Sequence, residues 1–314
     1  ITPEKLLVIT FTREAALSMR QRFAQISPQE VHTVNFGTFH SVFYQILLQS
    51  GRISSGNILN DRQKKDLILP ILKKITDCKK RSAAEVTELA GNYLAAIGYY
   101  KNTGDIENSR KKLPEEEKQH FSRIYEAYEE ARKNTGGLDF EDMLKECEEF
   151  LQRDPVQRTY WQNRFEYILI DEFQDINYRQ YSIVKILAEK HRNIFAVGDD
   201  DQAIYGFRGA HPDVQSALRE AWPSLESVTL AASHRSAAGI LTSASALLGL
   251  SSACGKLIPT RNTEACLHLF SAPDARKEAA WVADQVALLL GGTSHTLEDS
   301  RRRDATLATP CPAL

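Results

Sequence analysis

The sequence of 314 residues has few cysteines and no long apolar run. Its five cysteines stand far apart at positions 78, 147, 254, 266 and 311 and form no Cys-x-x-Cys pair. This distribution argues against a disulfide framework or a zinc site and predicts a reducing, cytoplasmic location. No run approaches the ~18 apolar residues that a membrane span requires. Because no signal peptide is visible either, we expect no membrane association.

Neither sign of charge is in excess. Lysine and arginine number 39 against 41 aspartate and glutamate, which gives a net charge of −2. The hydrophobic content of 42% and charged content of 25% are typical of a globular protein with a large core. A protein that binds nucleic acid needs a basic groove and not a basic total, so this balance does not exclude one.

The sequence contains no Gly-x-x-x-x-Gly-Lys-Ser/Thr phosphate loop. The nearest candidate runs from Gly249 to Gly255-Lys256-Leu257, but its spacing is wrong and it lacks the hydroxyl that binds magnesium. We therefore expect the chain by itself to bind a nucleoside triphosphate poorly.

Two short apolar runs, Tyr167–Ile170 and Ile194–Val197, each end abruptly in carboxylates. Runs that are short, β-branched and without alternation predict strands buried on both faces of a parallel sheet. The carboxylates then stand at the carboxyl ends of the strands, where open α/β sheets form their ligand crevices. A similar run, Leu6–Phe11, predicts a further buried strand with Thr12 as the N-cap of the following helix.

The residues at these strand ends suit nucleotide chemistry. Asp171 closes a hydrophobic strand, the position from which a carboxylate holds nucleotide-bound magnesium through water. Glu172 could then orient or deprotonate the attacking water, and Gln202 could contact a terminal phosphate without adding charge. Taken alone, the Asp171-Glu172 pair is better explained as a strand that runs into a solvated turn. The residues that follow the second run, Ile194–Val197, make the nucleotide site the better explanation. They are closely spaced polar and aromatic residues: Gly198, Asp199, Gln202, Tyr205, Phe207 and Arg208.

Two longer patterns resemble motifs of a known family. They are Asp171-Glu-Phe-Gln-Asp175 and Val197-Gly-Asp-Asp-Asp-Gln-Ala-Ile-Tyr-Gly-Phe-Arg-Gly-Ala210. They resemble motifs II and III of the UvrD/Rep/PcrA-like superfamily 1 DNA helicases. The resemblance implies an ATP-dependent 3′–5′ DNA helicase with ATP and Mg²⁺ as cofactors. It places the phosphate loop just upstream of Ile1 and motifs V and VI beyond the other end.

Three segments are expected to contact single-stranded DNA. Phe11 and Thr12-Arg-Glu-Ala-Ala resemble motif Ia, although Arg13 and Glu14 depart from the usual Thr-Asn-Lys-Ala-Ala. Thr38-Phe39-His40-Ser41 resembles motif Ib and precedes an apolar helix over Val42–Leu48. The hydroxyl and imidazole groups of this segment suit phosphate, and its aromatic ring suits a base. A histidine beside an apolar helix is more often structural, so the inference depends on its neighbours.

The third of these segments contains Tyr205, Phe207 and Arg208. Its aromatic rings and its cation could stack on bases and hold a phosphate. The alternative is a hydrophobic plug that fills the loop. We favour DNA contact because Gln202 lies only a few residues upstream, and a loop that touches both nucleotide and bases could couple them.

Residues 52–137 differ in character from the rest. They read as charged amphipathic helices with breaks at Gly91-Asn92, Gly98, Asn102-Thr-Gly104 and Gly136-Gly137. Their basic clusters include Lys79-Lys-Arg81 and Arg110-Lys-Lys112, each of which is by itself more simply a solvated helix face. Such a block between strands of one sheet predicts an inserted subdomain. Asp139, just after it, is as good a helix N-cap as a ligand.

A second domain is predicted to begin with a strand at Ser227–Ala232, followed by Ser233-His-Arg-Ser236 and a helix. This segment resembles motif IV, normally Asn-Tyr-Arg-Ser. The resemblance implies that Arg235 reaches the γ-phosphate across the interdomain cleft and that His234 stands where a tyrosine packs on adenine. A strand at Leu267–Phe270 and a helix at 278–290 complete the expected part of this domain.

We therefore predict an α/β fold, a RecA-like parallel sheet with an inserted helical subdomain and the start of a second RecA-like domain. The predicted segments are 1–51 and 138–225 for domain 1A, 52–137 for subdomain 1B, 226–290 for part of domain 2A, and 291–314 for a disordered or non-native tail. The expected partners are single-stranded and partly duplex DNA and unidentified repair or recombination proteins. The alternatives are a catalytically silent DNA-binding fragment and the helicase arm of a helicase–nuclease.

Overall fold

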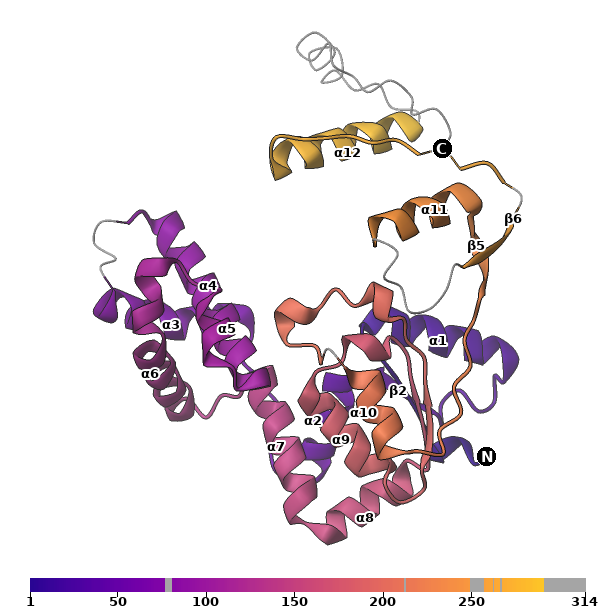
Figure 1. Ribbon diagram of the computed structural model, residues 1–314. Helices are drawn as coiled ribbons and strands as arrows, with labels where there is room; N and C mark the ends of the chain where they lie inside the picture. Colours follow the sequence, from indigo (N-terminus) through magenta and orange to yellow (C-terminus); the bar gives the residue numbers. More distant parts are fainter. Residues whose placement is uncertain (77–80, 212, 249–256, 262, 266, 291–314) are drawn as a thin grey trace. The chain divides into compact units, whose positions relative to one another are not determined.

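The structure of the chain is a computed structural model that describes residues 1–76, 81–211, 213–248, 257–261, 263–265 and 267–290. The chain divides into two compact units, Ile1–Leu225 and Glu226–Leu314 (Figure 1). The predicted tail at 291–314, the basic pair Lys79-Lys80 and most of the Gly249–Leu257 loop lie outside the described residues.

The first unit contains a four-stranded parallel sheet with the order β2-β1-β3-β4. Its strands are β1 (Leu6–Thr10), β2 (Asn35–Thr38), β3 (Tyr167–Ile170) and β4 (Asn193–Ala196). The register pairs Ile9 with both Gly37 and Ile170, and Ile170 with Ala196. Because all pairs are parallel, the carboxyl ends of the four strands lie along one edge. The predicted α/β fold with a parallel sheet is confirmed.

Burial differs between the middle and the edge of this sheet. Leu7 and Ile9 of β1 are fully buried and Val8 is 8% exposed, which fits the prediction for this strand. In β3 buried residues alternate with half-buried ones, so burial on both faces was wrong there. The prediction was also wrong for the strand after β3: β4 begins one residue earlier and is not buried on both faces, since Phe195 is 63% exposed. Among the described strands, β4 is the last in the order, so it has a neighbour on one side only.

Helices pack around the sheet (Figure 1). They are α1 (Arg13–Ile26), α2 (Phe39–Gln49), α7 (Phe140–Arg153), α8 (Pro155–Arg164), α9 (Tyr178–Ala188) and α10 (Val214–Ala221). The predicted cap is confirmed, because the Thr12 side chain accepts the Ala15 N–H at the start of α1. The buried stripe of α9 joins α2 and α7 in one hydrophobic core under the sheet.

The insert between α2 and α7 forms a second hydrophobic core. Its helices are α3 (Asp61–Ile75), α4 (Ala83–Thr103), α5 (Ile106–Arg110) and α6 (Phe121–Asn134). The breaks predicted at Gly91 and Gly98 were wrong, because α4 runs through both and ends only at Gly104, whose φ of 71° is left-handed. Among the described residues, no helix is both long and apolar enough to cross a bilayer.

Within the described residues of the second unit there are two parallel strands and two helices. These are β5 (Ala232–Ala237), α11 (Ala238–Leu247), β6 (Ile258–Arg261) and α12 (Ala275–Leu289). The strand predicted at Ser227–Ala232 was wrong, since only its last residue belongs to β5. Leu267–Phe270 is not a strand either; Phe270 instead stacks on Trp281 with ring centroids 4.4 Å apart.

Candidate nucleotide and nucleic-acid site

Backbone hydrogen bonds bring the ends of β1, β3 and β4 together. The Asp171 N–H donates to the Ile9 carbonyl at 3.0 Å, and the Val197 N–H donates to the Ile170 carbonyl at 2.9 Å. One step further, the Phe173 N–H donates to the Val197 carbonyl at 2.9 Å. The carboxylates that follow β3 therefore lie beside the loop that follows β4, as the parallel sheet predicts.

Three carboxylates follow β3. Burial, and then the charge of Glu172, raise the pKa of both Asp171 and Asp175. Within the described part of the chain none of the three forms an ion pair, and Asp175 Oδ1 is buried without a hydrogen-bond partner. A carboxylate without a protein cation is the kind of oxygen donor that a hard divalent ion prefers, so Asp171 by itself fits Mg²⁺. The three carboxylates do not converge on one point, because in the described part of the chain the group whose ligand atoms lie within 4.8 Å of one another is Glu129, Asp139 and Asp142.

Gln202 is connected to Glu172 by hydrogen bonds. It lies on the short 3₁₀ turn η5 (Asp200–Gln202), and its Nε2 donates to Asp199 Oδ2 at 2.6 Å. The Asp199 N–H donates to Gln174 Oε1 at 3.0 Å, and Gln174 Nε2 donates to Glu172 Oε2 at 2.7 Å. The carboxylate expected to act as base and the amide expected to contact phosphate thus belong to one network.

Aromatic rings from two distant segments gather beside this network. Tyr205 stacks on Phe11, the residue after β1, with ring centroids 4.7 Å apart and planes at 29°. The Arg208 guanidinium lies 5.1 Å from the Tyr205 ring centroid and 5.5 Å from that of Phe207. Phe207 is 60% exposed, so the loop is not a sealed hydrophobic plug. The cluster offers ring faces and a cation to solvent, which suits unpaired bases and phosphate.

The predicted motif Ib residues differ in accessibility. Thr38 Oγ1 accepts the Ser41 N–H as the N-cap of α2, and His40 lies edge-on to Phe140. Burial, and then the charge of Lys64, lower the pKa of His40 to about 4. At neutral pH the imidazole is therefore uncharged and could bind phosphate only by a hydrogen bond.

Phe39 requires a correction. Its side chain is 1% exposed and belongs to the core under the sheet, so it has no ring face open to a base. Thr38 and His40 instead line a groove of about 630 Å³ between α1, α2 and the start of α7, together with Arg13, Arg20 and Tyr44. The groove supplies cationic and aromatic groups beside the two residues that remain accessible.

The insert contacts the aromatic loop directly. Lys112 Nζ donates to the Phe207 carbonyl at 2.8 Å, and Asn102 Nδ2 donates to the Arg208 carbonyl at 3.3 Å. Gly209, with a φ of 86°, would place an added Cβ 3.0 Å from Thr103. Of the predicted basic clusters, Lys112 is thus used to hold the loop, and Arg81 pairs with Glu117 at 2.7 Å.

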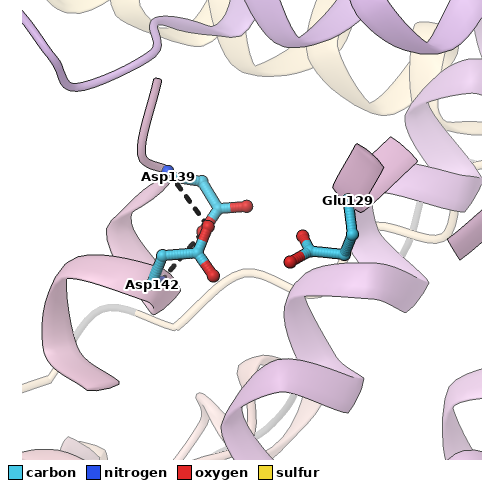
Figure 2. Close-up of side chains that lie close together, drawn as sticks. All are labelled: Glu129, Asp139 and Asp142. Carbon is cyan, nitrogen blue, oxygen red and sulfur yellow. Dashed lines mark hydrogen bonds between the residues drawn. The ribbon is translucent and has the colours of Figure 1, made fainter. Parts of the chain in front are cut away.

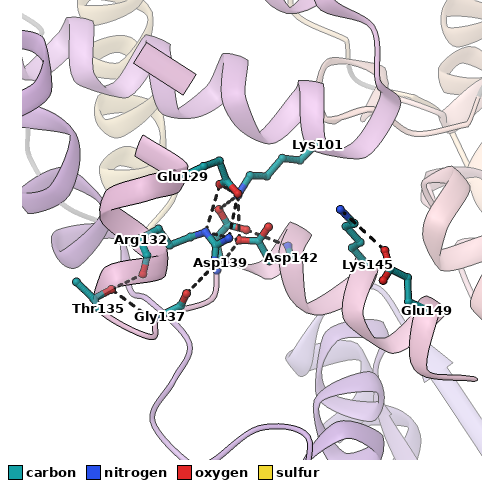
Figure 3. A network of polar contacts seen from close by, with 9 residues as sticks. All are labelled: Lys101, Glu129, Arg132, Thr135, Gly137, Asp139, Asp142, Lys145 and Glu149. Carbon is teal, nitrogen blue, oxygen red and sulfur yellow. Dashed lines mark hydrogen bonds and ion pairs between the residues drawn. The ribbon is translucent and has the colours of Figure 1, made fainter. Parts of the chain in front are cut away.

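A second group of carboxylates lies where the insert meets α7 (Figure 2). Oxygen atoms of Glu129, Asp139 and Asp142 lie within 4.8 Å of one another. Lys101 contacts all three carboxylates, with Nζ 2.6 Å from Asp139 and 2.9 Å from Asp142, and Arg132 pairs with Glu129 and Asp142 (Figure 3). Because the protein's own cations occupy this cluster, it is a structural ion-pair network. Asp139 is also the N-cap of α7.

His234 and Arg235 of the second unit both lie on β5 and are exposed. The His234 ring is 3.0 Å from Thr260 Oγ1, and Arg261 donates to the Arg235 carbonyl at 2.9 Å. This contact with Arg261 uses the backbone carbonyl of Arg235 and not the Arg235 guanidinium. The segment predicted to follow the strand is therefore the strand itself.

Comparison with known proteins identifies the family of this chain. Residues 1–223 match the family described as the UvrD/REP helicase N-terminal domain. The chain belongs to this family. It is 37% identical over 250 residues to a putative ATP-dependent DNA helicase YjcD of Bacillus subtilis, covering 78% of this chain and 32% of that protein.

Two further relatives are named ATP-dependent DNA helicase PcrA. The one from Staphylococcus epidermidis is 32% identical over 255 residues, which cover 79% of this chain and 34% of the relative. That of Staphylococcus aureus is 30% identical over 295 residues, covering 91% of this chain and 39% of the relative. The UvrD/REP chain thus spans about a third of the length of the curated relatives it matches. The predicted resemblance is confirmed.

Sequence reasoning missed several residues that organise this UvrD/REP site. Gln174 stands inside a recognised motif, but nothing in the sequence signals which groups its amide contacts. Asn102 and Lys112 lie about 95–106 positions before the loop they hold, so only the fold reveals their role. In the sequence, the cluster at 110–112 is visible only as a run of positive charge, without any indication of what Lys112 contacts.

Proposed function

We propose that this chain is part of an ATP-dependent helicase that moves 3′ to 5′ along single-stranded DNA and separates the strands of a duplex. The observation that carries the proposal is the meeting of the carboxylates after β3 with the Gln202 loop after β4 at one edge of the sheet. Nucleotide chemistry and the exposed aromatic cluster then share the same segment, 198–210, which is what a motor that couples the two requires.

In this proposal each group has a defined role. Asp171 would hold Mg²⁺ through water, and the ion would supply positive charge against that of the phosphates. Glu172 accepts the proton of the attacking water, while Gln202 and Arg235 contact the γ-phosphate and His234 faces adenine. Phe11, Thr12, Thr38, His40, Tyr205, Phe207 and Arg208 form the DNA-binding set.

Two alternatives make different predictions. A catalytically silent fragment would bind DNA without turnover, and the helicase arm of a helicase–nuclease would work beside a nuclease domain. Repair, replication restart and recombination, with a cytoplasmic location, are the biological settings we propose. Partner proteins from these processes would then act on the same partly duplex DNA.

We expect the full-length protein to hydrolyse ATP in the presence of Mg²⁺ and to do so faster when single-stranded DNA is added. The reason is that bases held by the aromatic loop would fix Gln202 and Glu172 in the same network. Steady-state ATPase assays with and without DNA measure this directly. Turnover that DNA does not change would contradict the coupling, and DNA binding without any turnover would favour the silent fragment. The 314-residue chain alone is expected to be inactive.

Replacing Phe207 by alanine is expected to weaken binding of single-stranded DNA by roughly 5- to 150-fold, the equivalent of ~1–3 kcal/mol for one lost base stack. Because Phe207 is 60% exposed, the substitution should leave the core intact. Fluorescence anisotropy with a labelled oligonucleotide measures the affinity. Ile204, in the same loop and 70% exposed, gives the matched control Ile204→Ala, since its side chain has no π face. Equal losses in both variants would assign the effect to the loop as a whole.

A further inference from the structure

A buried amide joins the segment after β3 to the segment after β4. Gln174 lies on the 3₁₀ turn η4 (Phe173–Asp175) and is 3% exposed. Its Oε1 accepts the Asp199 N–H at 3.0 Å, and its Nε2 donates to Glu172 Oε2 at 2.7 Å. A backbone N–H can only donate, so the amide must turn its oxygen towards Asp199 and its NH₂ towards Glu172. Both ends of the amide are therefore hydrogen-bonded, and its orientation is fixed.

The same connection continues through Asp199. Its carboxylate accepts the Asp201 N–H at 3.1 Å through Oδ1 and Gln202 Nε2 at 2.6 Å through Oδ2. A shift of the Gln202 side chain or of its turn is thus transmitted to the Asp199 backbone, and from there to the Gln174 amide. The chain of contacts ends at one oxygen of Glu172, which leaves Oε1 of that carboxylate available to accept a proton.

The space around the amide is restricted on the β4 side. A Cβ at Gly198 would lie 2.9 Å from Gln174 Oε1 and 3.2 Å from the Gln174 backbone nitrogen. Both distances are shorter than ordinary van der Waals contact, and the second atom belongs to the backbone and cannot move aside. Gly198 therefore permits the close approach that the Gln174–Asp199 hydrogen bond requires.

The backbone at the other end of the amide is also unusual. Glu172 has φ 53° and ψ 46°, one of only two left-handed residues other than glycine within the described chain. A non-glycine residue keeps this conformation only where its surroundings enforce it. The Phe173 N–H bonded to Val197 O holds the backbone, and the Gln174 amide holds the side chain.

We propose that Gln174 is a positioning residue that aims the Glu172 carboxylate and links its position to the Gln202 turn. The inference rests on the proposed function, in which Glu172 is the base. Gln174 does not touch the nucleotide in this proposal; it acts through Glu172 on one side and through Asp199 on the other. A change at Gln174 should consequently reduce the rate of hydrolysis without changing how tightly ATP or DNA binds.

The test uses Gln174→Met in the full-length protein, which keeps the length of the side chain and removes both hydrogen bonds. The kcat of DNA-stimulated ATP hydrolysis should fall about 10- to 100-fold, because small misplacement of a catalytic group is costly. The KM for ATP and the Kd for single-stranded DNA should change by less than about 3-fold, as expected when binding is preserved. A kcat within about 2-fold of the unmodified protein would overturn the inference.

Gln180→Met is the matched control. Gln180 is also 3% exposed, and its Oε1 accepts the Asn177 N–H at 2.9 Å at the start of α9, so its hydrogen bond involves neither Glu172 nor Asp199. It should lower the unfolding midpoint but retain kcat. If the two methionine variants lose kcat equally, the role of Gln174 is only structural and the inference fails.

Two further variants separate positioning from folding. In Gln174→Glu the introduced carboxylate can still accept the Asp199 N–H but repels Glu172, so kcat should fall at least as far as in Gln174→Met; a kcat equal to that of the unmodified protein would contradict the inference. Gly198→Ala should lower kcat by displacing the amide without removing any polar group. Turnover retained in Glu172→Gln would refute the proposed function itself. An inactive Glu172→Gln with a fully active Gln174→Met refutes only the positioning role.

Discussion

Glu172→Gln in the full-length protein should lower DNA-stimulated ATP hydrolysis by about 10²–10⁴-fold, the usual contribution of a general base. The amide has nearly the same shape as the carboxylate, and its oxygen can still accept the hydrogen bond that Gln174 donates at 2.7 Å. What is lost is only the ability to take a proton from water. The affinities for ATP and for single-stranded DNA should therefore remain, and rapid-mix ATPase assays together with binding titrations measure the difference.

Glu166→Gln provides the control for this prediction. Glu166 lies immediately before β3, at the opposite end of the strand that precedes Asp171, and it pairs with Lys5 on the surface. Its replacement should leave hydrolysis unchanged, because the carboxyl ends of the strands carry the proposed site. Turnover in the Glu172 variant equal to that of the Glu166 variant would remove Glu172 as the base.

Lys101→Met should destabilise the first unit by about 3–5 kcal/mol, the cost of removing one partner from a buried ion pair. The ammonium is 5% exposed and contacts Glu129, Asp139 and Asp142 (Figure 3). Burial opposes its charge, but the Asp139 and Asp142 carboxylates raise the pKa of Lys101 overall. Without it, Arg132 alone faces three carboxylates. Urea unfolding followed by tryptophan fluorescence measures the loss.

The same loss should depend on pH. Burial, and then the neighbouring Asp139, raise the pKa of Asp142 to about 7, so the folded state binds a proton there that the unfolded state releases. Folded stability from this group falls as the pH rises towards and through 7. Removing Lys101 favours protonation further, so the deficit of the variant should be larger at about pH 8 than at about pH 5.5. A deficit that grows on acidification would contradict this account.

Lys145→Met is the control for the network. Lys145 lies on α7 close to the same cluster but is 58% exposed, and its nitrogen is 3.9 Å from Glu149 (Figure 3). Exposed pairs of this kind contribute about 0–1 kcal/mol, so this variant should unfold almost like the unmodified protein. Equal destabilisation by both methionine substitutions would show that burial of the network is not what matters.

The sheet of the first unit was predictable from short runs of residues. Leu6–Ile9 and Tyr167–Ile170 are apolar without alternation, and the chain places both strands in the middle of the sheet, with a neighbouring strand on each side. The end caps were predictable too, because Thr12 and Asp139 bond to nearby backbone groups. Information confined to a few neighbouring residues is enough for features of this kind.

Features that depend on distant partners were not predictable. β5 begins at Ala232 because it pairs with β6, more than twenty residues later, although the preceding residues have the higher strand propensity. Gly98 stays within α4, where an added Cβ would meet Glu141 at 3.2 Å. Tertiary packing decides both cases against the local preference.

The error at Phe39 has a simple geometric cause. The helix was predicted from Val42, whereas α2 begins at Phe39 itself. Three, four and seven residues after Phe39 stand Val42, Phe43 and Ile46, all buried, so Phe39 opens the apolar stripe of the helix. His40, one position later, is turned away from that stripe. The helix begins three residues earlier than predicted, and this shift buries Phe39 and leaves His40 accessible.

The hold of the insert on segment 206–209 has a mechanical consequence. Lys112 and Asn102 donate hydrogen bonds to backbone carbonyl oxygens of this segment, and these bonds do not depend on the side chains of the segment. Substitutions of Phe207 or Arg208 would leave those two attachments in place. Asn102 lies near the end of α4 and Lys112 follows α5, so segment 206–209 can change its position only by breaking these bonds or by moving together with both attachment points of the insert.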